Sequence, residues 1–174
     1  MAERTGLAIF GYAYRPLHTT NPQDGGFSVN LLQGGLLIFN EYSLNLQITR
    51  EIRFQLPADT AWRTLALIEQ SRPWLPSVPP RMTTGEDTVS EYTFCFAGYN
   101  PFRMEDMIQL MDCPFRTMRG HYVRLVYGLM ESISSLLLNS GVDLQPGSFR
   151  WDERIIQPLT PPQPPMGVQN AHYA

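Results

Sequence analysis

Three polar residues of one predicted helix, His121, Arg124 and Glu131, have the types and spacing that could carry out catalysis. Offsets of three and seven residues bring side chains to the same face of a helix. Beside a cleft, an imidazole, a guanidinium and a carboxylate would supply a base, an anion clamp and an acid. A solvated polar stripe opposite the apolar face of the helix explains the same residues equally well, so both interpretations stay open.

Metal chemistry has weaker support in the sequence. Glu105, Asp106 and Asp112 offer the oxygen ligands that a hard cation prefers. Neighbouring carboxylates at the start of a helix are, however, typical partners of the helix dipole. Cys95 and Cys113 lack the CxxC spacing of a zinc site. We therefore predict no metal site and no cofactor.

The charged residues exclude several classes of function. All 13 basic residues are arginine, which rules out a lysine Schiff base and a P-loop lysine. With 16 acidic residues the net charge is −3, and this balance argues against a nucleic-acid surface. No segment approaches the roughly 20 apolar residues of a membrane span, and none has the length of a signal sequence. We therefore expect a cytoplasmic protein that binds neither nucleic acid nor membrane.

Residues 42–56 form the strongest strand pattern of the chain. Apolar side chains occupy every even position except Arg50, and polar side chains occupy the odd ones. This alternation predicts a half-buried antiparallel strand, either long and bent or divided by a bulge near Arg50. The pattern places on the buried face Leu46, Ile48, Ile52 and Phe54, and on the exposed face Asn45, Gln47 and Arg53. Arg50 then needs a partner or an exit to solvent.

Further strands are predicted at residues 7–14, 27–32, 35–40 and 89–97, and a short one within 142–151. The chain is expected to reverse at Asn40 and Glu41. Phe94 and Phe96 should point inward from the strand at 89–97. Since consecutive strands with short links tend to pair, the first four strands predict an antiparallel meander.

Two helices are predicted, over residues 58–71 and 117–139. Trp62, Leu65 and Ile68 should pack the first helix against the sheet. The second helix should face the sheet through Met118, Tyr122, Leu125, Leu129, Ile133 and Leu136, and should turn outward Gly120, Arg124, Gly128 and Glu131. Small residues on an outward face let a second backbone approach closely, so a homodimer through this face is also considered.

These elements predict one α+β domain, an antiparallel meander with helices packed on one face. The domain is expected to span residues 1–156. Residues 157–174 have the composition of a proline-rich, mobile tail.

The order of motifs resembles that of small bacterial proteins of unknown function. The resemblance covers roughly residues 7–150 and rests on GGFSV, then GGLLIFNEYSL, then the helix with Trp62, then YTFCFAGYN. It implies a strand meander, a helix, a strand and a long C-terminal helix. It brings no activity, cofactor or catalytic residue.

Two functional hypotheses follow. The first is a non-enzymatic protein-binding module, of the kind that neutralises a partner protein. Aromatic and arginine side chains are enriched at interfaces, so its candidate contact residues are Trp74, Tyr99, Arg103 and Arg124. The second is a small enzyme that uses His121, Arg124 and Glu131 in a cleft between the sheet and the long helix.

Overall fold

A computed structural model describes residues 7–78, 81–82, 90–97, 102–105, 121–145 and 147–160. For residues 81–82, 102–105 and 121–123 only the backbone is described. Tyr99, Asp106, Asp112, Cys113, Met118, Gly120 and residues 161–174 of the predicted tail lie outside the described residues.

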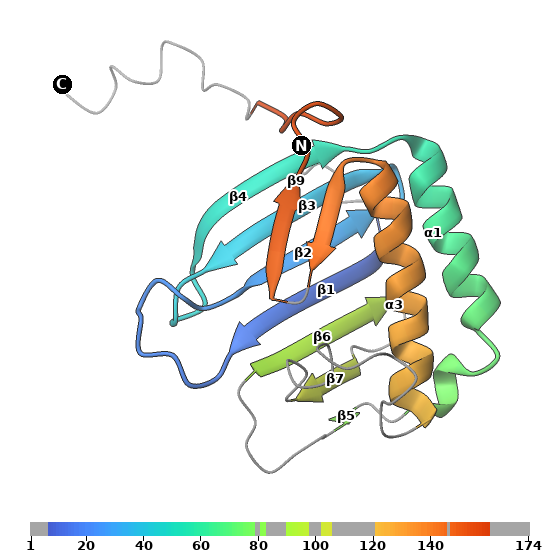
Figure 1. The fold of residues 1–174 in the computed structure, drawn as a ribbon, viewed down its shortest axis with the longest axis horizontal. Helices are drawn as coiled ribbons and strands as arrows, with labels where there is room; N and C mark the ends of the chain where they lie inside the picture. The colour runs from blue at the N-terminus through green and yellow to red at the C-terminus, as the bar shows by residue number, and fades with distance from the viewer. Residues whose placement is uncertain are drawn as a thin grey trace.

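Seven of the described strands form one sheet in the order β4-β3-β2-β1-β6-β7-β5 (Figure 1). The strands are β1 (Ala8–Pro16), β2 (Phe27–Leu32), β3 (Leu36–Tyr42), β4 (Ile48–Gln55), β5 (Arg81–Met82), β6 (Ser90–Phe96) and β7 (Phe102–Glu105). Neighbours are antiparallel, apart from the parallel pair of β5 and β7. The predicted meander of the first four strands is confirmed.

Helices and a hairpin cover one face of this sheet. They are α1 (Ala58–Ser71), the short 3-10 helix η1 (Leu75–Ser77), α3 (His121–Asn139) and the hairpin of β8 (Val142–Gln145) and β9 (Ser148–Trp151). In Figure 1, α3 and the hairpin cross in front of the sheet, and α1 packs beside α3. The α+β fold with helices on one face is as predicted.

Aromatic rings fill much of the space between the two layers. Phe94 and Phe96 point inward from β6 as predicted and are fully buried. Tyr127 of α3 packs edge-on against Phe94, with 6.2 Å between ring centroids. At the other end of the sheet, Phe149 of β9 stacks on Phe39 of β3 at 4.3 Å. The hairpin therefore closes the part of the core that α3 does not reach.

The prediction of one strand over residues 42–56 is wrong, although the register between β3 and β4 does shift next to Arg50, where a bulge was the alternative expectation. Tyr42 ends β3, the chain reverses over residues 43–47, and Ile48 begins β4. The expected reversal at Asn40 and Glu41 is wrong as well, because both residues lie within β3. The alternating pattern was misleading because Leu44 and Leu46, which belong to the turn, continue the two-residue period of the strand.

The predicted faces hold only in the second half of this segment. Phe54 is buried and Ile52 is half-buried, while Leu46 and Ile48 are each 55% exposed. The side chains predicted to face solvent do so: Asn45, Gln47 and Arg53. Phe54 is covered because the ring of Trp151 lies against it at 5.5 Å, and Ile48 stands at the uncovered start of β4.

The bounds of α1 match the prediction, but Trp62 is 61% exposed instead of packed on the sheet. The buried face carries Thr60, Ala61, Thr64, Ile68 and Ser71, and Leu65 packs at its margin. Two buried threonines on this face obscure its apolar spacing in the sequence. A buried hydrogen bond of 2.6 Å between Thr60 Oγ1 and Ser140 Oγ explains one of them.

The described part of α3 ends at Asn139 as predicted, but its buried arc is wider than expected. Leu129 and Ile133 face the core, and Leu125 and Leu136 are half-buried. The spacing missed four residues that are also buried: Val126, Tyr127, Met130 and Leu137. The reason is that α1 and β8 pack on the flanks of α3 while the sheet packs beneath it.

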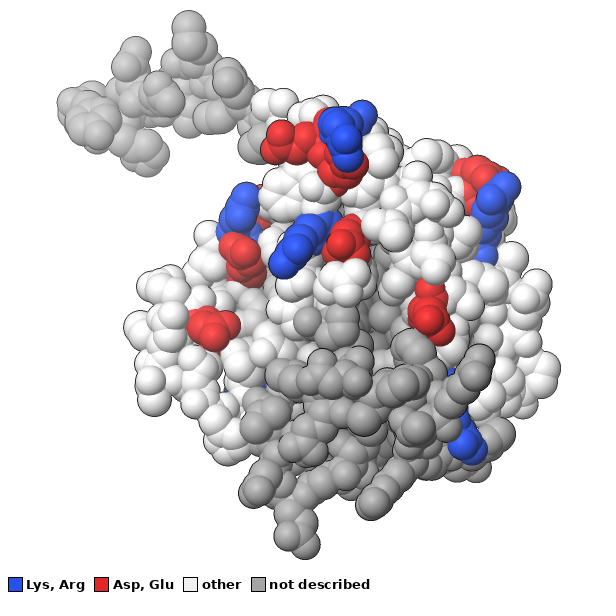
Figure 2. Space-filling view, viewed as in Figure 1, with Lys and Arg blue, Asp and Glu red and all other residues white. Residues whose placement is uncertain are grey.

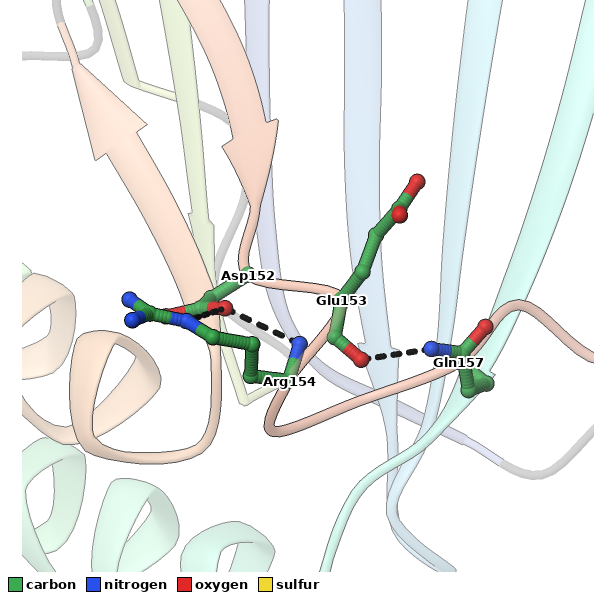
Figure 3. A network of polar contacts seen from close by, with 4 residues as sticks. All are labelled: Asp152, Glu153, Arg154 and Gln157. Carbon is green, nitrogen blue, oxygen red and sulfur yellow. Dashed lines mark hydrogen bonds and ion pairs between the residues drawn. The ribbon is translucent and has the colours of Figure 1, made fainter.

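A short turn after β9 directs the chain toward the edge of the sheet. Asp152 accepts hydrogen bonds from the backbone and the guanidinium of Arg154, and Gln157 donates to the carbonyl of Glu153 (Figure 3). Beyond this turn, Leu159 N–H donates to the carbonyl of Arg53 on edge strand β4 at 2.7 Å. Residues 157–160, assigned to the tail by composition, thus include a backbone contact with the sheet.

Candidate functional site

The three helix residues of the enzyme hypothesis are only partly described. Arg124 and Glu131 are exposed on α3, as is Gly128, which agrees with the outward face predicted for them. The side chain of His121 is not described. No hydrogen bond or ion pair joins Arg124 to Glu131 in the described structure. The enzyme hypothesis and the homodimer through this face stay predictions.

A cleft lies between α3, the β8–β9 hairpin and the sheet beneath them, with a volume of about 340 Å³. We call it the α3–hairpin cleft. Its inner wall is largely apolar and consists of the buried side chains of Tyr12, Phe94, Tyr127, Met130 and Leu144, while Leu138 is the exposed apolar residue of the lining. Its polar lining residues are Glu131, Ser134, Ser135, Asp143 and Gln145. Glu131 is therefore the one residue of the enzyme hypothesis among the described residues that line the cleft.

The polar lining of the cleft carries negative charge. Glu131 comes from α3 and Asp143 from β8, and acidic side chains lie over both elements in Figure 2. Asp143 Oδ1 accepts a hydrogen bond from Gln145 Nε2 at 2.7 Å, which orients its carboxylate. No arginine is among the described lining residues. The described lining thus offers two carboxylates that can bind a positively charged group.

Two tyrosines of the inner wall stay neutral over the physiological range. Burial raises the pKa of Tyr12 and of Tyr127 far above the usual tyrosine value. Each hydroxyl therefore keeps its proton and acts as neither a base nor an anionic nucleophile. The described lining contains aromatic and apolar surface with fixed polar groups, an arrangement suited to binding.

A second candidate site is the turn between β3 and β4, which we call the β3–β4 tip and define as residues 43–48. Ser43 N–H donates to the carbonyl of Gln47, and Leu46 N–H donates to the carbonyl of Ser43. These bonds define a three-residue hairpin loop, a type I turn followed by one residue in the left-handed conformation. That residue is Leu46, with φ of 60°. Glycine ordinarily occupies this position.

The tip exposes three aliphatic side chains, those of Leu44, Leu46 and Ile48. The neighbouring loop holds the tip through a backbone hydrogen bond from Leu44 N–H to the carbonyl of Pro22, and Gly25 N–H donates to the carbonyl of Tyr42 just before the tip. Gly25 allows this close approach, because a Cβ there would lie 1.9 Å from the carbonyl oxygen of Ser43. The exposed leucines are thus presented on an anchored backbone.

The remaining candidate contact residues from the sequence are described to different extents by the structure. Trp74 is half-buried and packs against the core, so its ring is partly engaged within the fold. Arg103 lies in β7, but its side chain is not described. Arg124 is exposed on α3, and Tyr99 lies outside the described residues.

Sequence reasoning missed the tip, whereas the enzyme hypothesis placed Glu131 in a cleft between the sheet and the long helix, and Glu131 does line such a cleft. One signal for the tip was available, since Asn45 is a favoured turn residue within the apparent strand. The rest of the cleft lining had no comparable signal, because Tyr12 and Asp143 are brought near Glu131 only by the tertiary fold.

The described residues contain no group of three side chains suited to hold a metal ion. None of the helices in the described parts of the chain has the length and apolar character needed to cross a membrane. A scan of the sequence against protein-family models gives no match, and a search of curated proteins gives none either. Function must therefore be inferred from the residues themselves.

Proposed function

We propose that this protein is a non-enzymatic protein-binding module whose contact surface is the β3–β4 tip. The observation that carries the proposal is Leu46, which combines a left-handed backbone with a side chain that is 55% exposed. A branched residue in this conformation costs roughly 1–2 kcal/mol. Burial of the side chain does little to offset that cost, because more than half of it faces solvent.

Glycine or asparagine at position 46 would serve the turn better. A leucine there is accounted for by a contact outside the chain, since strained residues concentrate at sites of function. Leu44 and Ile48 extend the apolar surface on both sides of Leu46. We expect the partner to be a protein with an apolar groove that accepts these aliphatic side chains.

The border of the tip has the polar character of an interface rim. Arg50 Nη1 lies 3.9 Å from Glu41 Oε2, and both side chains are about half exposed. An apolar centre with charged residues around it is the usual anatomy of a protein–protein contact. On the face seen in Figure 2, described side chains of both signs are interspersed, so no large area carries a single sign.

The experiment compares capture of host proteins by the wild type, Leu46→Gly and Trp62→Ala. Trp62 is the matched control, because its side chain is similarly exposed but lies on α1, at the opposite end of the molecule (Figure 1). A partner protein identified by mass spectrometry should bind the wild type and Trp62→Ala with the same affinity. Leu46→Gly should weaken its binding at least about tenfold, or ~1.4 kcal/mol. The same affinity for all three proteins would exclude the tip as the contact surface.

A further inference from the structure

We infer that the α3–hairpin cleft binds a protonated amine carried on an apolar or aromatic stem. This site is separate from the β3–β4 tip, and the inference does not depend on the proposed function. It rests on the shape of the cleft, the composition of its wall and the charge of its rim.

The volume of about 340 Å³ falls within the range of roughly 300–1,000 Å³ that is usual for small-molecule sites. The inner wall is lined by the aromatic side chains of Tyr12, Phe94 and Tyr127, of which only small parts reach the solvent, with Met130 and Leu144 beside them and the exposed aliphatic side chain of Leu138 at the opening. These surfaces favour an apolar or flat group over a strongly hydrated one. The wall therefore selects the stem of the ligand.

Charge at the rim selects the other end of the ligand. The carboxylates of Glu131 and Asp143 approach the cleft from α3 and from β8, and no arginine is among the described lining residues. Arg150 stands opposite Asp143 in the hairpin register, but the structure records no ion pair between them. An anionic ligand would be repelled by this rim, whereas an ammonium group would gain a charge-assisted hydrogen bond.

A divalent metal ion fits this lining less well than an amine does. Calcium takes about six to eight oxygen ligands, and magnesium demands octahedral oxygen coordination. The described lining brings only two carboxylates, on separate elements, next to an aromatic wall. An ammonium group is bound by charge-assisted hydrogen bonds, for which two carboxylates suffice.

The test is a titration of the isotope-labelled protein with three probes of similar size, monitored through the NMR chemical shifts of the backbone amides. The probes are phenethylamine, 2-phenylethanol and phenylacetate, which carry a positive, a neutral and a negative end. Phenethylamine should bind with a Kd of about 1 mM, as expected for so small a molecule, and should shift amides in residues 131–135 and 143–145. The alcohol should bind at least about tenfold more weakly, and phenylacetate should not bind.

Variants separate the contributions of charge and wall. Glu131→Gln combined with Asp143→Asn should weaken phenethylamine binding about tenfold and leave 2-phenylethanol unchanged. Leu138→Ser should weaken both probes, and its exposure of 53% makes the change tolerable for the fold. Glu51→Gln is the matched control, since this exposed carboxylate on β4 does not line the cleft.

Four results would overturn the inference, and the first three come from probes that bind. These three are equal affinity for the amine and the alcohol, undiminished amine binding by the double variant, and amide shifts confined to other parts of the chain. Absence of binding by every probe would overturn it as well. None of these results would affect the proposed role of the tip, which has a separate surface and a separate readout.

Discussion

Leu46 and Arg50 both depart from the usual preferences of a β-hairpin, but the fold compensates only one of them. The guanidinium of Arg50 lies 5.8 Å from the ring centroid of Trp151 and also approaches Glu41. These contacts provide the partner that a charge on an apolar stripe requires. Leu46 has an unfavourable backbone conformation and an exposed side chain, so its presence weakens the isolated fold.

Replacement of Leu46 by glycine should therefore stabilise the protein. We expect Leu46→Gly to raise the free energy of unfolding by about 0.5–1 kcal/mol, because relief of the left-handed strain exceeds the added entropy of glycine in the unfolded chain. Urea unfolding should show a higher midpoint with an unchanged slope.

Leu44→Gly is the control, since Leu44 occupies the same loop without a positive φ. This variant should unfold at a midpoint equal to or below that of the wild type. Destabilisation by Leu46→Gly would show that the leucine stabilises the fold and would remove the main support for a binding role of the tip.

Among the elements, α1 and α3 are tied together by a polar contact within their packed interface. Thr60 lies in the first turn of α1 and Ser140 directly follows α3, and both side chains are buried. Their hydroxyl groups share the hydrogen bond of 2.6 Å. Loss of one partner leaves the other buried without this bond, which carries the full cost of desolvation.

Thr60→Val should thus lower the free energy of unfolding by about 1–3 kcal/mol. Addition of Ser140→Ala should cost less than the sum of the two single changes, because the second change removes the unpaired hydroxyl. Thr64→Val is the control, since Thr64 Oγ1 donates to a carbonyl of its own helix, and its effect should add to that of Ser140→Ala. Additive effects of Thr60→Val and Ser140→Ala would contradict the coupling.

Local sequence patterns predicted some of these residues and elements correctly and missed others. The bounds of α1 and the inward face of β6 follow from local periodicity, and both are correct. Periodicity failed at residues 43–47, because Leu44 and Leu46 match a strand in spacing while hydrogen bonds of the loop determine the backbone. The helix spacing suggested Glu131 for a cleft beside the sheet, but the contribution of Asp143 could not be predicted, because no local pattern encodes which residues of the hairpin lie near α3.

At the scale of the whole molecule, buried tyrosines link the sheet to α3. Tyr12 on β1, Tyr92 on β6 and Tyr127 on α3 are each nearly or fully inaccessible to solvent. Burial is the main cause that raises the pKa of Tyr92 to about 12, and it raises the other two still further. The folded chain holds these protons at a pH where the unfolded chain releases them.

The stability of the protein should therefore be lost in alkali. Because the pKa of each buried tyrosine is higher in the folded chain than in the unfolded chain, its contribution to stability is fully present below the ordinary tyrosine pKa of about 10. The free energy of unfolding then falls as the pH rises toward about 12 and beyond. Between pH 10 and 12, Tyr92→Phe should reduce the slope of log Kunf against pH by about one, since one fewer proton is released on unfolding. Urea unfolding at several pH values measures this slope. An unchanged slope would mean that Tyr92 ionises equally in the folded and unfolded chain.

The order of the strands also determines when each edge of the sheet closes during synthesis. Strands β1 to β4 pair with their neighbours in sequence, so the ribosome releases a complete four-stranded meander before β6 exists. The free edge of β1 must then wait for the pairing of Phe10 with Phe96. At about 5–20 residues per second, this delay is on the order of several seconds. During that interval β1 offers the nascent chain an apolar, unpaired edge, and it is the strand at which chaperone binding or aggregation should begin.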